Sequence, residues 1–250
     1  MKRTIFLSFL MLIIASPLVN AYTFEKYEGE RAYYLPIFSQ DLGQDTYERN
    51  GYSVEFPTNA PVALKKAIIK HLFDYNGTSL EYATKEFLQC SAIDETPRLV
   101  SSIPEDNMYV SYNWVSGSLI SQSSNLIVYK SFFENYSAGA AHPMYGEAYL
   151  NYYIPTKKEL KLADLFIMSK ESAINRAIRK NARKVSDSLY NPNDLSGITC
   201  HDDFYLSPKG ITFIYQPYEI GPFAAGVIEI TVSKAQLTGC LTALGKKLIK

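Results

Sequence analysis

The chain has 250 residues, a length that allows one domain or two small ones. It is 47% hydrophobic and 20% charged, which supplies a sizeable core and excludes an intrinsically disordered chain. The 25 Lys and Arg balance 25 Asp and Glu, so the composition argues against a nucleic-acid partner, because such binders neutralise phosphates with excess positive charge. The 20 Tyr and 13 Phe favour a β-rich fold.

The first 21 residues have the order of a secretory leader. Lys2 and Arg3 form a basic start, an apolar run follows to Ala15, and residues 19–21 supply the small side chains that signal peptidase needs. We therefore expect a signal peptide that is cleaved after Ala21 and a mature chain that is secreted or periplasmic. No later stretch is apolar enough for a membrane span, so we expect none in the mature chain.

Three cysteines, an odd number, would lie in an oxidising compartment after export. Cys90, Cys200 and Cys240 allow three different single disulfides, and the sequence does not choose among them. Their separations fit no zinc or Cys-x-x-Cys pattern, so we predict no metal site and no cofactor. A small, buried apolar role for each cysteine is the simpler expectation.

Residues 22–105 are expected to form a small N-terminal subdomain of one strand and two short helices. Alternating apolar side chains predict a strand over residues 52–56. Asn59 is expected to cap a first helix that Gly77 closes. The segment from Thr78 to Glu81 then fits a capping box that opens a second helix.

From Met108 onward the pattern is typical of strands separated by turns. Strands are predicted at residues 110–114, 125–133 and 145–154, with turn residues at 116–117, 121–124 and 139–143 between or beside them. This order indicates an antiparallel meander.

One long helix is expected over residues 169–190, because apolar side chains share a stripe along it. Its other face is basic, which suits either an anionic partner or, more commonly, a solvated surface. The basic residues are Arg176, Arg179, Lys180, Arg183 and Lys184. A hairpin over residues 204–215 and a strand at 228–232 follow. The sum is an α+β fold: an antiparallel β-sheet with helices packed on one face, preceded by the small strand-plus-two-helix subdomain.

Three segments in this order carry a family resemblance: YSAGAAHP at 136–143, LKLADLF at 160–166, and FYLSPKGITF at 204–213 continued by YQPYEIGPFAAG at 215–226. Together they resemble the domain-of-unknown-function family that forms the C-terminal extracellular domain of the lysozyme-sensing anti-sigma factor RsiV. The same family occurs in the peptidoglycan deacetylase PdaC. The resemblance covers roughly residues 108–240, so we predict an RsiV-like domain over residues 106–250.

The resemblance implies an exported recognition protein of the cell envelope. Its expected partner is lysozyme, a lysozyme-like protein, or a cell-wall glycan such as a peptidoglycan fragment. The chain has no sigma-binding segment and no room for a deacetylase domain, so we expect binding without catalysis. The sequence does not predict the oligomeric state.

Candidate ligand-binding residues lie in two irregular segments of the resembling region. His142 follows Gly139 and two alanines, where backbone can approach a ligand closely; alternatively, neighbouring backbone holds both ring nitrogens and fixes the turn. Tyr218 and Glu219 lie between prolines and glycines. Glu219 can accept hydrogen bonds from a ligand or cap amides of its own turn, with Tyr218 packed in the core.

Aromatic side chains of the predicted strands offer a binding platform for sugar rings or a partner protein, although half of them are expected in the core. They are Tyr112, Trp114, Tyr149, Tyr152 and Tyr153.

The alternative function is a small envelope hydrolase acting on peptidoglycan or polysaccharide. It requires His142 and Glu219 to share one cleft. No nucleophile elbow, metalloprotease motif or nucleotide fingerprint occurs, so we predict no catalytic residues.

Overall fold

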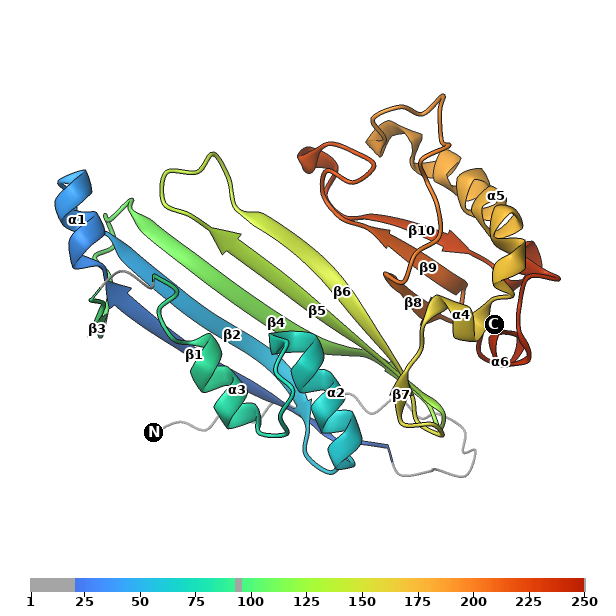
Figure 1. Cartoon of the computed structure of the whole chain (residues 1–250), viewed down its shortest axis with the longest axis horizontal. Helices are drawn as coiled ribbons and strands as arrows, with labels where there is room; N and C mark the ends of the chain where they lie inside the picture. The colour runs from blue at the N-terminus through green and yellow to red at the C-terminus, as the bar shows by residue number, and fades with distance from the viewer. Residues whose placement is uncertain (1–20, 93–95, 250) are drawn as a thin grey trace, which may run out of the picture.

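Seven strands form one long sheet (Figure 1). The computed structural model describes residues 21–92 and 96–249. The strands lie in the order β3-β1-β2-β4-β5-β6-β7, and neighbours are antiparallel except β2 and β4, which are parallel. Their bounds are Phe24–Tyr34 for β1, Tyr47–Pro57 for β2, Arg98–Val100 for β3, Val110–Gln122 for β4, Leu126–Tyr136 for β5, Met144–Tyr153 for β6 and Lys158–Glu159 for β7.

Two helices, α2 (Val62–Phe73) and α3 (Leu80–Phe87), cover one face of this sheet (Figure 1). Apolar residues of α2 recur at helical spacing and are buried against inward-facing strand residues, which explains why the helix docks there. This core contains Val54, Phe56, Leu64, Ile68, Ile69, Leu72, Ala83, Val115, Ile127, Tyr129, Leu150 and Tyr152. A further helix, α1 (Pro36–Leu42), joins β1 to β2.

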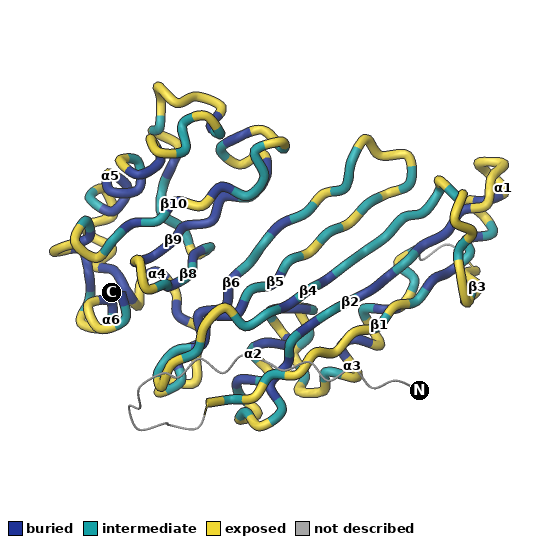
Figure 2. The backbone as a smooth tube through the Cα atoms, turned by 180° about the vertical axis from the view of Figure 1, so that it is seen from behind, coloured by how far each residue is buried: buried dark blue, intermediate teal, exposed yellow. Residues whose placement is uncertain are grey.

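A second, three-stranded sheet has the order β10-β9-β8 and lies beside β6. Its strands are β8 (Phe204–Ser207), β9 (Gly210–Tyr215) and β10 (Ile228–Val232). The helices α4 (Leu162–Leu165), α5 (Glu171–Ala182) and α6 (Ala243–Leu248) complete this part of the chain. α5 packs on β10 and lies on the side of the second sheet that faces away from the long sheet (Figures 1 and 2).

β6 is the element that the two cores share. Successive side chains of a strand point to opposite faces, so Leu150 packs under α2 whereas Tyr149 and Tyr153 pack toward the second sheet. Between them, the Asn151 amide donates to the Phe204 carbonyl at 2.7 Å and accepts from the Leu206 N–H at 2.9 Å. A buried side chain therefore ties the backbone of β8 to the long sheet.

The α+β class, with helices on one face of an antiparallel-dominated sheet, is confirmed. β2 pairs with β4, so the N-terminal strands belong to the same sheet as the later ones. The division into domains at residue 105 stays a prediction.

Three helix ends differ from the predicted ones. α2 begins at Val62, and Asn59 Oδ1 accepts from the Thr23 N–H at 2.7 Å instead of capping the helix. α2 ends at Phe73, ahead of Gly77. The cap of α3 is Ser79, whose side chain accepts from the Tyr82 N–H at 3.1 Å. The predicted capping box at Thr78 is therefore wrong by one residue.

Two other predicted boundaries are wrong. Ser116 and Gly117 lie inside β4, where a Cβ on Gly117 would meet the Tyr129 ring and hydroxyl; the glycine makes room for packing and forms no turn. The helix expected to reach residue 190 ends at Ala182 and continues as a 3-10 turn over Arg183–Ser188.

No disulfide joins Cys90, Cys200 and Cys240, all of which lie in the described part of the chain. Cys240 is buried, and the Cys90 sulfur lies 3.5 Å from the carboxylate of the buried Glu48. Among the described helices, none combines the length and apolar character needed to cross a membrane. The leader expected over residues 1–21 lies outside the described residues except for Ala21.

Candidate functional site

Four aromatic rings meet beside the start of β6, and we call them the ring cluster: His142, Tyr145, Tyr218 and Phe223. Phe223 lies at the centre, stacked on His142 with ring centroids 4.0 Å apart. Its centroid lies 5.2 Å from that of Tyr145 and 5.5 Å from that of Tyr218. The His142 Nε2 atom is 3.0 Å from the Tyr218 hydroxyl. The β5–β6 connection and the β9–β10 connection therefore meet through side chains.

Tyr218 has a backbone conformation that is unusual for a tyrosine. Its φ of 72° is in the left-handed region, which a bulky non-glycine residue adopts only at some cost in energy. The side chain is 47% exposed, although the predicted alternative was a tyrosine packed in the core. A strained backbone that presents an exposed, hydrogen-bonded aromatic ring is typical of binding loops.

The structure brings two of the four predicted site residues together, His142 and Tyr218. His142 is also held by backbone, because its Nδ1 atom lies 2.8 Å from the Pro143 carbonyl oxygen. Gly139 has a φ of 88°, and a Cβ added to it would meet no atom within 4 Å, so it is an open turn residue. Glu219 accepts from the Gln216 N–H of its own turn at 2.8 Å, which is the amide-capping alternative.

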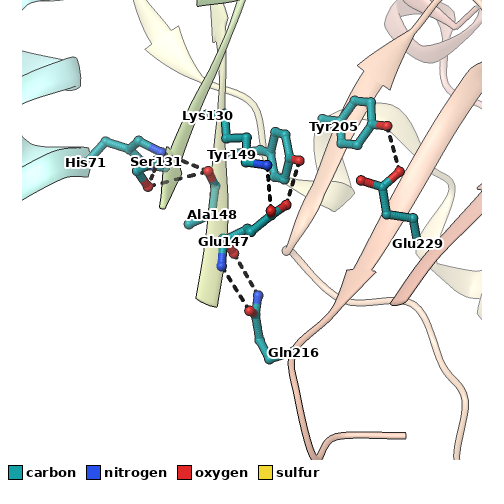
Figure 3. Close-up of polar contacts among 9 residues, drawn as sticks. All are labelled: His71, Lys130, Ser131, Glu147, Ala148, Tyr149, Tyr205, Gln216 and Glu229. Atoms are coloured by element: carbon teal, nitrogen blue, oxygen red, sulfur yellow. Dashed lines mark hydrogen bonds and ion pairs between the residues drawn. The ribbon is translucent and has the colours of Figure 1, made fainter. Parts of the chain in front are cut away.

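Two residues before Tyr218, Gln216 joins the second sheet to the long one (Figure 3). Its amide bonds to both backbone groups of Glu147: the oxygen accepts from the Glu147 N–H at 3.0 Å, and the nitrogen donates to the Glu147 carbonyl at 2.7 Å. The same nitrogen lies 2.6 Å from Asp203 Oδ2. Gln216 thus continues the hydrogen bonding of β6 where no strand pairs with it.

The carboxyl of Asp203, which lies beside Gln216, has a raised pKa. Burial raises the pKa of its carboxyl to about 6, with the nearby charges of Glu219 and Glu147 adding to the effect, while the Gln216 hydrogen bond opposes it. A carboxyl with such a pKa exchanges its proton close to neutral pH.

The side chain of Glu147 bonds to residues of β5 and β6 (Figure 3). Its carboxylate pairs with the Lys130 ammonium at 2.5 Å and accepts from the Tyr149 hydroxyl at 2.9 Å. Burial, followed by the Glu147 charge, raises the pKa of Tyr149. The Tyr149 ring stacks on Tyr205 with centroids 4.5 Å apart, which packs the two sheets together.

The other face of the long sheet is free of helices over β1, β2 and β4 among the described elements (Figure 2). One row across this open face runs from Trp114 to Glu134 and on to Tyr145, because these residues are cross-strand partners. Tyr145 belongs to the ring cluster, so the open face and the ring cluster are continuous. Further half-buried aromatic rings of the same face pair across the strands: Tyr112 with Tyr136, and Phe132 with Tyr145.

The five aromatic residues of the predicted platform divide between core and surface. Tyr149, Tyr152 and Tyr153 are buried. Tyr112 and Trp114 are half-buried on the open face. No sequence pattern selected the other rings of this surface, which are Phe132, Tyr145 and Phe223. The strand alternation already placed Tyr145 and Glu147 on one face, whereas the approach of Phe223 depends on a long-range contact.

A serine and a histidine also meet in the core, which no sequence pattern predicted. Ser131 Oγ lies 3.1 Å from His71 Nε2, and the Ala148 carbonyl oxygen is 3.3 Å from the same nitrogen (Figure 3). Burial lowers the pKa of His71. Ser131 is only 5% exposed under α2, so this pair is a packing contact and not a reachable nucleophile. Within residues 21–92 and 96–249, no three His, Cys, Asp or Glu side chains are placed to hold a metal ion.

The part of the chain that carries Tyr218 and Phe223, with α5 and the second sheet, can be compared with known families. Residues 163–235 match the family model described as Protein of unknown function (DUF3298). Within this DUF3298 match lie the long-sheet contact Gln216 and two of the four rings. His142 and Tyr145 lie outside it.

Solved DUF3298 structures share the fold over nearly the whole chain. A DUF3298 family member from Bacteroides fragilis has a TM-score of 0.70 at 19% identity and covers 89% of this chain and 94% of that one. A DUF3298 family protein from Pseudomonas aeruginosa has a TM-score of 0.63 at 15% identity, with 90% and 96% covered. At these identities the likeness shows the fold alone. No curated protein matches the chain.

Proposed function

We propose that this chain is an exported recognition protein of the cell envelope that binds its ligand without transforming it. The observation that carries this proposal is the row of half-buried side chains Trp114, Glu134 and Tyr145, which crosses the open face and ends in the ring cluster. Aromatic side chains left at a surface, with polar groups beside them, are typical binding anchors. Within the proposal, the RsiV-like resemblance supplies the ligand class: a lysozyme-like protein or a cell-wall glycan.

Charge favours the protein ligand over the glycan. Residues 22–153, which contain the whole open face, carry 16 Asp and Glu against 9 Lys and Arg. By strand register, the side of the sheet that carries Trp114 has an excess of two acids on β1, β2, β4, β5 and β6: Glu28, Glu30, Glu55, Glu134 and Glu147 against Lys26, Arg49 and Lys130. Three of the acids, Glu28, Glu30 and Glu147, are ion-paired with Lys26, Arg49 and Lys130. A cationic protein of the lysozyme type complements such a surface and would be steered toward it at low salt.

Calorimetric titration of the mature chain with a lysozyme, and separately with soluble peptidoglycan fragments, tests the proposal. Tyr218→Ala should weaken binding of the true ligand by about tenfold or more, because the exposed anchor is lost. Tyr82→Ala is the matched control, since Tyr82 is 48% exposed against 47% for Tyr218 but lies on α3. If neither ligand gives a heat of binding even at high concentration, the ligand class is rejected.

Export is a separate part of the proposal and has its own test. The Gln122 side chain accepts from the Tyr22 N–H at 3.0 Å and donates to the Tyr22 carbonyl at 3.1 Å, so the residue that directly follows the expected cleavage site is held by the long sheet. N-terminal sequencing of the protein recovered outside the cytosol should therefore start at Tyr22. A chain recovered only with Met1 at its start would contradict export.

A small envelope hydrolase is the second candidate function, and the raised pKa of Asp203 is the observation that favours it. A carboxyl with a pKa of about 6 keeps its proton in part of the molecules near neutral pH and can act as a general acid. Turnover of peptidoglycan or polysaccharide that is lost in Asp203→Asn, and unaffected in the exposed Asp187→Asn, would support this function over simple binding. His142→Ala and Glu219→Gln test the pair that the sequence singles out in the same assay.

A further inference from the structure

The outer face of α5 and of the 3-10 turn after it carries four cations, which we call the α5 stripe: Arg176 and Lys180 in α5, and Arg183 and Lys184 in the turn. All four side chains are exposed, and the first three are spaced by four and three residues, so they share one side of the helix. The opposite side is the buried side, through Ile174, Ile178 and Ala182. The stripe therefore faces away from the core of the second sheet.

None of the four side chains has a carboxylate within ion-pair distance among the described residues. The ion pairs of the described chain involve Lys26, Arg49, Lys130 and Lys161. Arg179 is different from the stripe, because its Nε atom donates to the Ile198 carbonyl at 3.0 Å and so holds the following loop. Glu171 and Asp187 are the acidic residues nearest in sequence, and each lies beyond an end of the stripe.

Charge is divided unevenly along the chain. Residues 154–250 carry 14 Lys and Arg against 9 Asp and Glu, the reverse of the acidic excess of residues 22–153. α5 lies on the side of the second sheet that faces away from the long sheet, as both views show (Figures 1 and 2). A positive surface and the acidic open face thus belong to different parts of the molecule.

Apolar side chains are exposed at both ends of the stripe. Ile167 and Met168, at the start of the 3-10 turn that precedes α5, are each 39% exposed, and Tyr190, which follows Leu189 after the second 3-10 turn, is 58% exposed. Basic side chains flanked by exposed aliphatic and tyrosine side chains suit a lipid interface, where the cations meet headgroups and the apolar groups enter the boundary region. A soluble polyanion would leave these apolar side chains without a contact.

We propose that the α5 stripe docks the protein on an anionic phospholipid surface, with the candidate site left facing away from the lipid. Each Lys or Arg near an anionic surface adds to the attraction, and the attraction is screened by salt. The apolar face of α5 is used inside the protein, so the helix lies against the surface without inserting. This inference depends on the placement of charge and is independent of what the ring cluster binds.

Co-sedimentation of the mature chain with vesicles tests the inference. Phosphatidylcholine vesicles are compared with vesicles that also contain phosphatidylglycerol. We expect binding only to the second, weakening as salt rises. A variant in which all four stripe residues are replaced by Gln should lose about tenfold or more of its partition onto the anionic vesicles.

The matched control removes four exposed cations elsewhere: Lys66→Gln, Lys70→Gln, Lys85→Gln and Lys209→Gln. It changes the net charge equally and should keep most of the binding. The tryptophan emission of both variants, which matches that of the parent chain when they are folded, separates a binding defect from unfolding.

Three results would overturn the inference. They are equal binding to both kinds of vesicle, equal loss in the control variant, and tighter binding of soluble polyphosphate than of vesicles at the same phosphate concentration. The last result would assign the stripe to a soluble polyanion. Met168→Ser combined with Tyr190→Ser should weaken vesicle binding and leave polyphosphate binding unchanged, since only the lipid uses those side chains.

Discussion

Trp114, the chain's one tryptophan, lies over the backbone of Gly51 on the open face. A Cβ added at Gly51 would meet the Trp114 ring at 2.2 Å, so only glycine lets the indole approach β2 this closely. We predict that Gly51→Ala lowers the free energy of unfolding by about 1–3 kcal/mol and shifts the tryptophan emission, because the ring must leave its position. Urea unfolding followed by fluorescence measures both.

A second glycine provides the control for that prediction. Gly139→Ala places its methyl in open space, and the strain of its φ of 88° is local to the turn. It should leave the tryptophan emission unchanged. An unaltered emission in Gly51→Ala would show that the ring does not rest on β2.

The carboxyl of Asp203 makes stability depend on pH. Its pKa is raised from 3.8 to about 6, so the folded chain holds this proton more tightly than the unfolded chain does. The resulting stabilisation is complete below the unfolded pKa and is lost as pH rises through about 6. Asp203→Asn should therefore match the parent chain near pH 4 and exceed its stability by about 1 kcal/mol near pH 8, a value discounted for partial exposure.

Thermal unfolding across this pH range measures the difference, and Asp187→Asn, at an exposed position, should change nothing. The Asn side chain keeps an acceptor for Gln216, so the hydrogen bond survives the substitution. A parent chain that gains stability relative to Asp203→Asn as pH rises would contradict the sign.

At the scale of the element, α3 shows how a helix selects its cap. Ser79→Ala removes the oxygen that accepts from the Tyr82 N–H and should cost about 1 kcal/mol. Thr78→Ala, one residue earlier, removes the cap that the sequence pattern favoured and should cost little. Chemical denaturation of the two variants distinguishes them, and the reverse order of stabilities would restore the predicted capping box.

The attachment of the second sheet depends on Gln216. Gln216→Ala leaves the Glu147 N–H and carbonyl without their partner and should cost about 2–3 kcal/mol. Hydrogen exchange at the Glu147 amide should accelerate in this variant. Gln89→Ala, which removes a single bond to Lys85 at the exposed end of α3, is the control and should have little effect on either measurement.

Periodicity predicted many of the elements, missed the short helices α1, α4 and α6, and predicted neither the caps nor the pairing. Alternation located the strands at residues 52–56 and 145–154, and the apolar stripe located α5, because these signals depend on which face is buried. The parallel pairing of β2 with β4 and the ends at Asn59 and Thr78 depend on groups far along the chain or on a choice between adjacent cap residues. The bond between Asn59 and Thr23 involves such a distant group.

The candidate site was likewise predicted only in part. Gly- and Pro-rich segments marked His142 and Tyr218 as irregular and chemically equipped, and the structure brings the two together. Phe223, at the centre of the rings, lies in the same Pro- and Gly-rich segment as Tyr218, but the sequence does not predict its contact with His142, because that contact arises from the packing of two connections. For Glu219 the sequence also allowed amide capping, and the structure shows that contact.

At the scale of the whole molecule, the helix-covered face of the long sheet, its open face and the α5 stripe lie apart from one another. α2 and α3 close one face of the long sheet, the second sheet is tied to β6, and the open face leads into the ring cluster. The acidic half of the chain carries the open face, and the basic half carries the α5 stripe. A protein held at an anionic surface through α5 would keep its binding face available to a cationic partner.

Titration of Trp114 fluorescence tests the central claim most directly, because this side chain lies on the open face and no other tryptophan interferes. With a lysozyme chemically modified to remove its own tryptophan emission, or with soluble peptidoglycan fragments, the account predicts a saturable change in Trp114 emission that Tyr218→Ala weakens and Tyr82→Ala preserves. Saturable binding by calorimetry with an unchanged Trp114 signal, equal in both variants, would place the ligand elsewhere and contradict the account.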